Sequence, residues 1–209
     1  VVPSVYHARK AERAGVDIIV ASGHEGGAHV SWEPVHSMVL LPAVVRAVSR
    51  PVVAAGGFWD GSTLAAALCM GAVGIQMGTR FIATVESDFQ EIWKRTILGH
   101  DERGTIVGRG IFGPMRFLNN ARAKMLVKRT IEDFPSFFLG ESVPSNSAIL
   151  DLERAGFDAL LDGDPENALM FGGECSGRIE DLPTVRELIR SIMTEVVQSI
   201  KFVNGFVCG

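Results

Sequence analysis

Apolar runs that end directly in a glycine-containing turn recur along the first 80 residues, and this recurrence constrains the fold more than any other feature. Each apolar run with its turn indicates one unit of strand, glycine turn and helix, and this unit is repeated. Successive units of this kind are typical of a parallel sheet with right-handed crossovers, whose loops gather at the carboxyl ends of the strands. The sequence therefore predicts an α/β fold. The predicted strands cover residues 17–21, 52–55 and 73–77, and their turns cover residues 22–29, 56–57 and 78–79.

Two architectures share this pattern, the doubly wound sheet and the TIM (β/α)8 barrel. The doubly wound sheet is less favoured, because no G-x-G-x-x-G fingerprint follows any of the predicted strands. Helices are expected between the strands. Ser4 should cap a short helix that Gly15 ends, and a core-facing helix should carry Pro42 near its first turn. A third helix is predicted over residues 62–70.

The regular pattern changes after residue 81. Ser87 and Gln90 have the spacing of a capping box, which predicts a helix that continues to Leu98. Residues 99–150 show no sustained period, so we predict an irregular excursion packed on the barrel face, with a short strand near residues 105–107. A C-terminal helix is predicted over residues 181–203. Its apolar stripe, expected to face the core or an interface, consists of Val185, Leu188, Ile189, Ile192, Met193, Val196 and Ile200.

Composition excludes several functional classes. The net charge of -4 gives no basic field for a phosphate backbone, so no nucleic-acid partner is expected. No apolar run approaches the roughly 18 residues of a membrane span, so no membrane partner is expected either. The cysteines Cys69, Cys175 and Cys208 form no C-x-x-C pair and no even disulfide framework, which favours a reducing, cytoplasmic location. With this hydrophobic content, we predict a single domain over residues 1–209.

The glycine pairs after the second and third strands have two interpretations. Backbone N–H groups approach a phosphate closely where side chains are absent, so Gly56 with Gly57 and Gly78 with Thr79 fit an anion site. Glycines also make tight turns with no ligand, and the spacing alone leaves both interpretations open. Arg80 fits either a phosphate contact or an ion pair with a carboxylate such as Glu86, and we favour the ion pair.

The first turn carries histidines at positions 24 and 29. Glycines stand where a zinc helix would have to align its ligands, so no metal site is predicted. A loop that directs one imidazole into a pocket suits proton transfer, because the pKa of histidine lies near 6.5. Hydrogen bonding within the loop is an equally open interpretation. Glu25 is expected to anchor the loop, and His7, His36 and His100 to be structural or exposed.

Taken together, three segments resemble the nitronate monooxygenase family, once called 2-nitropropane dioxygenases. They occur in the family order and near the family spacing, and a weaker match covers residues 116–119 and 172–177. The resemblance implies an FMN-dependent (β/α)8 barrel, with the flavin enoyl-acyl carrier protein reductases as relatives. The segments are Gly23-His24-Glu25-Gly26-Gly27-Ala28-His29, Pro51-Val52-Val53-Ala54-Ala55-Gly56-Gly57, and Gly74-Ile75-Gln76-Met77-Gly78-Thr79-Arg80-Phe81 with Glu86-Ser87.

The resemblance also implies roles for individual residues. His29 would be the catalytic base, and Ser22 and Gly23 would lie beside the flavin. The chain departs from the usual family pattern where Ser22 and Glu174 each replace a common glutamine, and where the order of small residues before His29 differs. The FMN phosphate would be held by Gly56, Gly57, Gly78 and Thr79, with Gln76 and Met77 leading into that site.

The implied activity is oxidation of alkyl nitronates or nitroalkanes with O2. One alternative is NAD(P)H-dependent reduction of enoyl thioesters or quinones on the same fold. Another is a catalytically inactive half-barrel that serves as an assembly subunit. The three units seen here would be the sixth to eighth of the family barrel, so we expect only its C-terminal part. An upstream segment or a partner chain would then complete the barrel.

Overall fold

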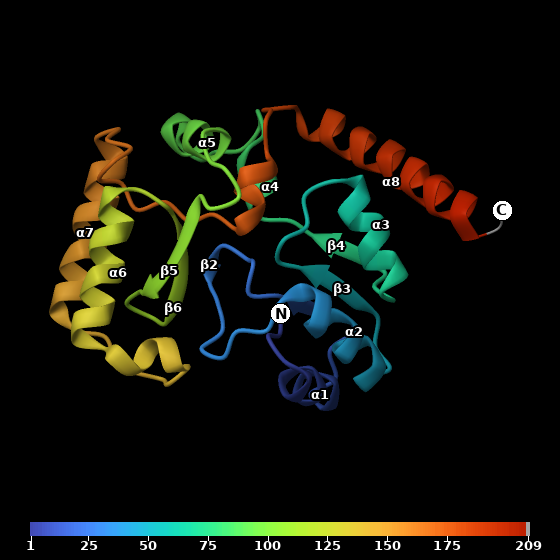
Figure 1. The fold of residues 1–209 in the computed structure, drawn as a ribbon, viewed down its shortest axis with the longest axis horizontal. Helices are drawn as coiled ribbons and strands as arrows, with labels where there is room; N and C mark the ends of the chain where they lie inside the picture. Colours follow the sequence, from blue (N-terminus) through green and yellow to red (C-terminus); the bar gives the residue numbers. More distant parts are fainter. Residues whose placement is uncertain (208–209) are drawn as a thin grey trace.

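Two three-stranded sheets, one parallel and one antiparallel, organise residues 1–207, the part of the chain that this computed structural model describes (Figure 1). Cys208 lies outside the described residues. The strands of the parallel sheet follow in the order β1-β3-β4, as expected from the repeated units. Its register pairs Ala21 with Ala54 and Ala55 with Gln76. These strands are β1 (Ile19–Ser22), β3 (Val52–Ala55) and β4 (Gly74–Gln76).

Three helices cover the parallel sheet, and their caps explain where they begin. Ser4 caps the first helix, and Asp60 forms a capping box with Thr63 at the third. The second begins at Ser37, so Pro42 lies in its second turn and the prediction of a first-turn proline was wrong. Apolar side chains such as Leu41 and Val44 join the sheet in one core cluster. The helices are α1 (Val5–Arg13), α2 (Ser37–Ala47) and α3 (Gly61–Cys69).

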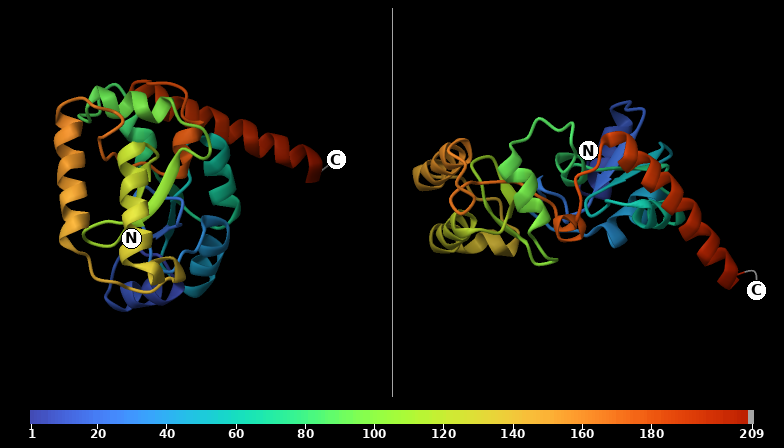
Figure 2. Two further views of the ribbon diagram at one scale, coloured as in Figure 1. Left: turned by 60° about the vertical axis from the view of Figure 1, so that its left-hand side comes forward. Right: turned by 90° about the horizontal axis from the view of Figure 1, so that it is seen from above.

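The antiparallel sheet lies on the other side of the molecule in Figures 1 and 2, with its strands in the order β2-β6-β5. Behind it, α6 and α7 contribute Leu126 and Ile149 to a core around Phe117. The sheet consists of β2 (Ala28–His29), β5 (Thr105–Arg109) and β6 (Pro114–Leu118). The helices here are α6 (Ala121–Asp133), η1 (Pro135–Leu139) and α7 (Ser147–Leu161).

The prediction of an irregular excursion over residues 99–150 was therefore wrong. All of β6 is buried, so the strand shows none of the alternation that marks a half-buried strand. The inner face of α6 is narrow, because only Ala123, Leu126 and Thr130 are buried among many charged residues. Asn120 and Asn146 cap the two helices and were the available local signals.

The last part of the chain returns to the parallel sheet. The Ser87 and Gln90 capping box is absent, because the helix begins at Glu91 and Gln90 makes no side-chain cap bond. The C-terminal helix begins at Val185, whose N–H donates to both carboxylate oxygens of Glu86 at 2.9 and 3.0 Å. The helices outside the two sheets' own cores are α4 (Thr79–Ile82), which follows β4, then α5 (Glu91–Leu98), η2 (Glu174–Arg178) and α8 (Val185–Val207).

Helix α8 packs against α3 and extends away from the rest of the chain (Figure 2). The carboxylate of Glu195 accepts a hydrogen bond from Gly61 N, which fixes the crossing of the two helices. Only part of the predicted apolar stripe is buried, and Ile189, Met193 and Ile200 are exposed. The buried members are Leu188, Ile192 and Val196. Within the described residues, no helix is long and apolar enough to cross a membrane.

Candidate active site

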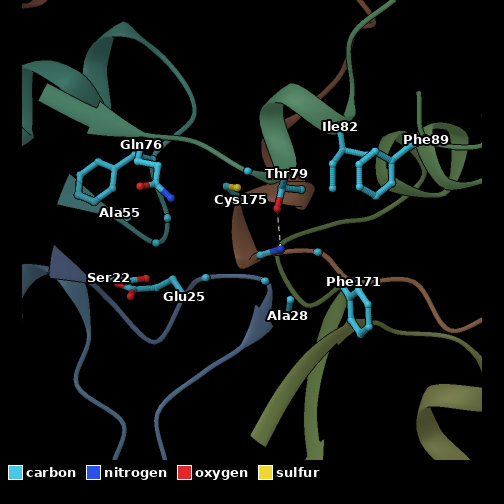
Figure 3. A pocket seen from close by; sticks show the side chains of 18 of the residues that line it. Ser22, Glu25, Ala28, Ala55, Gln76, Thr79, Ile82, Phe89, Phe171 and Cys175 are labelled. Carbon is cyan, nitrogen blue, oxygen red and sulfur yellow. Dashed lines mark hydrogen bonds between the residues drawn. The ribbon is translucent and has the colours of Figure 1, made fainter. Parts of the chain in front are cut away.

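A cavity of about 260 Å³ lies at the carboxyl ends of the three parallel strands (Figure 3). The turn after each strand contributes to its wall, which is the arrangement that the repeated units predict. Residues 171–173, Cys175, Phe89 and Trp93 close the opposite side. Six of the residues predicted from the sequence to hold the cofactor line this cavity. They are Ser22, Gly56, Gly57, Gln76, Gly78 and Thr79.

The glycines of the cavity serve two different purposes. Gly56 has a φ of +82°, and a Cβ there would lie 2.5 Å from the carbonyl oxygen of Gly23. This glycine lets the first two turns pack against each other. A Cβ on Gly78 would meet no atom within 4 Å, so its missing side chain leaves open space. Gly78 is therefore the position where a ligand can approach the backbone.

Backbone donors cluster at the same point. The hydrogen bonds of α4 begin with Phe81 N, which donates to Gly78 O at 3.0 Å. Among the described residues, the N–H groups of Gly78, Thr79 and Arg80 have no acceptor. Unpaired donors beside an open glycine are what a phosphate group requires, so this turn fits the phosphate of FMN.

The side chain of Thr79 is already engaged in the wall of the cavity. Its hydroxyl accepts a hydrogen bond from Gly173 N at 2.8 Å, drawn as the dashed line in Figure 3. The neighbouring Cys175 thiol is buried, and this burial raises its pKa to about 11. The thiol is therefore neutral at physiological pH and serves as an apolar wall.

An aromatic wall faces the glycine turns, and sequence reasoning missed it. Phe89 and Trp93 pack edge to face with ring centroids 4.7 Å apart. The indole N–H of Trp93 donates to the carbonyl oxygen of Phe171 at 2.9 Å, which ties α5 to the following glycines. The weak match over residues 172–177 was the available sequence signal for this side of the cavity.

Glu25 anchors the first turn, as predicted. Its carboxylate accepts hydrogen bonds from Ser37 N at 2.9 Å and from the Ser37 hydroxyl at 3.0 Å. A carboxylate at the N-terminus of a helix satisfies free N–H groups and complements the helix dipole. Glu25 thus starts α2 at Ser37 and fixes the turn against that helix.

His29 lies beside this cavity and not among the residues that line it. It lines a second cavity of about 190 Å³ with His24, and Ser22 contributes to both cavities. Strand β2 pairs His29 with Met115, and the His29 ring lies 6.4 Å from the ring of Phe112. His29 is exposed, so a small molecule can reach it.

The surroundings of His24 differ from those of His29. Burial lowers the pKa of His24 to about 4, and the positive charge of Arg116 adds to this effect. Its Nδ1 is buried with no hydrogen-bond partner among the described residues. His24 is therefore neutral near pH 7, and its imidazole is half-buried.

The remaining predicted residues lie elsewhere. Gly23 lines the second cavity, and Met77 lines neither cavity. Arg80 forms an ion pair, as favoured, but its partner is Asp181 at 2.8 Å because Glu86 is used at the start of α8. Within residues 1–207, no group of three or more His, Cys, Asp or Glu side chains could hold a metal ion.

Comparison with known proteins gives a consistent result. The family model described as nitronate monooxygenase matches residues 1–195. A curated relative from Mycobacterium tuberculosis, the "(3aS,4S,5R,7aS)-5-hydroxy-7a-methyl-1-oxo-octahydro-1H-indene-4-carboxyl-CoA dehydrogenase", is 33% identical over 99% of this chain and 68% of its own length.

Two solved structures resemble the chain closely. FabK from Thermotoga maritima has a TM-score of 0.85 at 32% identity and matches 98% of this chain. The nitroalkane oxidase from Streptomyces ansochromogenes has a TM-score of 0.79 at 28% identity and matches 97% of it. The chain spans 62% and 58% of these two proteins. The likeness confirms the α/β fold class.

Proposed function

Because the chain belongs to the nitronate monooxygenase family, we propose that it acts in an FMN-dependent oxidoreductase that oxidises alkyl nitronates or nitroalkanes with O2. The observation that carries this proposal is the position of His29. It lines the second cavity, which shares Ser22 with the first, and the residue before it, Ala28, lines the first cavity, where the open Gly78 turn suits a phosphate. A proton-transfer group and a cofactor site are therefore neighbours.

The residues of the first cavity would hold the cofactor. The backbone at Gly78 and Thr79 would bind the phosphate, with Gly56 and Gly57 across the turn and Gln76 leading into the site. Ser22 and Gly23 would lie beside the flavin, and Met77, which lines neither cavity, would lead with Gln76 into the phosphate site. When bound, FMN supplies an acceptor for two electrons and reactivity toward O2.

The role proposed for His29 is proton removal. A neutral imidazole accepts a proton from the carbon next to a nitro group, and the electron pair of the broken C–H bond moves onto the nitro group. Phe112, exposed beside the imidazole, offers an apolar contact for the alkyl part of a substrate. A substrate that arrives as the nitronate anion has already lost this proton and needs only to be positioned.

We also propose that the parallel sheet is the last part of a (β/α)8 barrel. Strand β4 has one neighbour in the sheet, and a single bridge from Val2 to Ala21 continues it beyond β1. Both edges of the sheet offer backbone groups for further strands. An upstream segment or a partner chain would fill them and complete the second cavity.

One observation favours a second candidate. The Mycobacterium tuberculosis relative and another from Rhodococcus jostii, each 33% identical, carry the name of a carboxyl-CoA dehydrogenase. In this alternative the same fold and flavin reduce an enoyl thioester or a quinone with NAD(P)H. His29 would then position or protonate the substrate.

Anaerobic mixing separates the two candidates. The FMN-loaded protein is mixed with a nitroalkane or with NAD(P)H in the absence of O2, and flavin absorbance is followed. Bleaching by the nitroalkane supports the proposal, whereas bleaching by NAD(P)H alone supports the alternative. If no flavin absorbance appears with or without a partner chain, the protein is an inactive half-barrel.

A further inference from the structure

The buried side chain of Arg116 connects three segments that meet at the candidate active site. It lies on β6, with 5% of its surface exposed. Its Nη2 donates to the carbonyl oxygen of His24 at 2.9 Å and lies 3.0 Å from Glu174 Oε1. Its Nη1 donates to Thr105 Oγ1 at 3.0 Å. One guanidinium thus joins the β5–β6 hairpin, the histidine loop and the segment after Gly173.

The backbone of the same residue holds the other end of the histidine loop. In the register of β2 with β6, Arg116 lies opposite Ala28, the residue directly before His29. Residues 24–29 are therefore held at one end by the side chain of Arg116 and at the other by its strand. Glu174 N also donates to Glu25 O at 2.9 Å, which fixes the middle of the loop to the same network.

We propose that Arg116 is a positioning residue, which sets the place of His29 through the loop, with Glu174 and Thr105 as its partners. The inference rests on the proposed role of His29. Arg116 lines neither cavity, so it has no direct access to a substrate there. A buried guanidinium is costly unless its N–H groups are paired. Here Nη1 and Nη2 are paired with Thr105, Glu174 and the carbonyl oxygen of His24 in the loop, while Nε has no hydrogen-bond partner among the described residues.

The test compares variants of the FMN-loaded protein by hydrogen exchange of residues 22–30 and by the kinetics of flavin reduction. Arg116→Lys keeps the charge but cannot reach three acceptors at once. Thr105→Val removes one hydrogen-bond acceptor of Arg116, and Glu174→Gln removes the negative charge of its ion-pair partner, each with little change in shape. Arg95→Lys is the matched control, because Arg95 is exposed and, within residues 1–207, its side chain pairs with Glu91 alone, on its own helix.

Loss of charge-assisted hydrogen bonds should raise exchange in residues 22–30 by about tenfold in Arg116→Lys, and by less in the two partner variants. The kcat for flavin reduction should fall by about 10- to 100-fold with KM and FMN affinity unchanged, because the base is misplaced. Arg95→Lys should change neither. Should Arg116→Lys fail to fold, Thr105→Val and Glu174→Gln carry the same prediction.

Two results would overturn the proposal. One is unchanged exchange in residues 22–30 in the folded variants. The other is faster exchange in these variants with an unchanged kcat, which would mean that the loop held by Arg116 does not set the place of His29. If the wild-type protein shows no flavin reduction by a nitroalkane, the proposed function fails, while the exchange measurement still tests the role of Arg116.

Discussion

His24 and His29 belong to one loop, but their surroundings separate their roles. His29 is exposed on β2, whereas His24 is half-buried with its carbonyl held by Arg116. Sequence spacing alone left both interpretations of the loop open, because it does not say which imidazole is buried. The resemblance selected His29, and its exposed position in the lining of the second cavity is compatible with that choice.

The burial of His24 predicts a pH dependence of stability. Its pKa is lowered to about 4 in the folded protein, so the unfolded chain binds more protons between roughly pH 6.5 and 4. The contribution of His24 to the free energy of unfolding is therefore complete above this pH window. It is lost as the pH falls through the window, at a rate of up to about 1.4 kcal/mol per pH unit. Urea unfolding of wild type and His24→Gln at pH 7 and pH 5 measures this. An equal loss in both proteins would contradict the assignment.

At the level of elements, the glycine turns and their strands were predictable because local features determine them. Strand β3 was predicted with its observed bounds, since an apolar run between Pro51 and Gly56 has clear limits. Of the antiparallel sheet, only β5 was predicted, as a short strand near residues 105–107. Strand β2 is two residues long and exists only because β6, distant in sequence, pairs with it. The aromatic wall of the cavity depends on the same long-range packing.

The two kinds of glycine predict different outcomes for the same substitution. Gly56→Ala forces a Cβ against Gly23 O and into a left-handed conformation, so it should destabilise the fold by about 1–3 kcal/mol. Gly78→Ala meets open space and should leave stability unchanged while its methyl group weakens FMN binding, by about tenfold. Thermal unfolding without FMN and a flavin titration provide the comparison. Equal effects of the two variants on unfolding would refute this division.

At the scale of the whole molecule, the two edges of the parallel sheet, at β1 and β4, are a feature that the local sequence patterns did not predict. The sequence indicated three successive units but contained nothing about what pairs with β4 or extends the bridge at Val2. Fold class followed from local patterns, whereas the proposed closure of a barrel would require pairing partners for the edge strands, which local patterns do not specify. Helix α8 packs against α3 but keeps several apolar side chains exposed, and the sequence pattern alone did not tell which of them would be buried.

Barrel completion predicts that FMN binding depends on added chain. Residues 1–209 alone should bind FMN weakly, and addition of an upstream segment or a partner chain should tighten binding by about tenfold or more, because it fills the open side of the site. Fluorescence quenching of FMN during titration with each protein measures both affinities. Tight binding by the monomeric 209-residue chain would contradict the proposal.

The central claim is that His29 removes the substrate proton, and the rate of anaerobic flavin reduction by a nitroalkane tests it most directly. His29→Ala should lower this rate by about two to four orders of magnitude with FMN still bound, because general base catalysis contributes that much. His7→Ala, which changes an exposed histidine on α1, should leave the rate unchanged. A loss below about tenfold in His29→Ala with FMN bound would contradict the account.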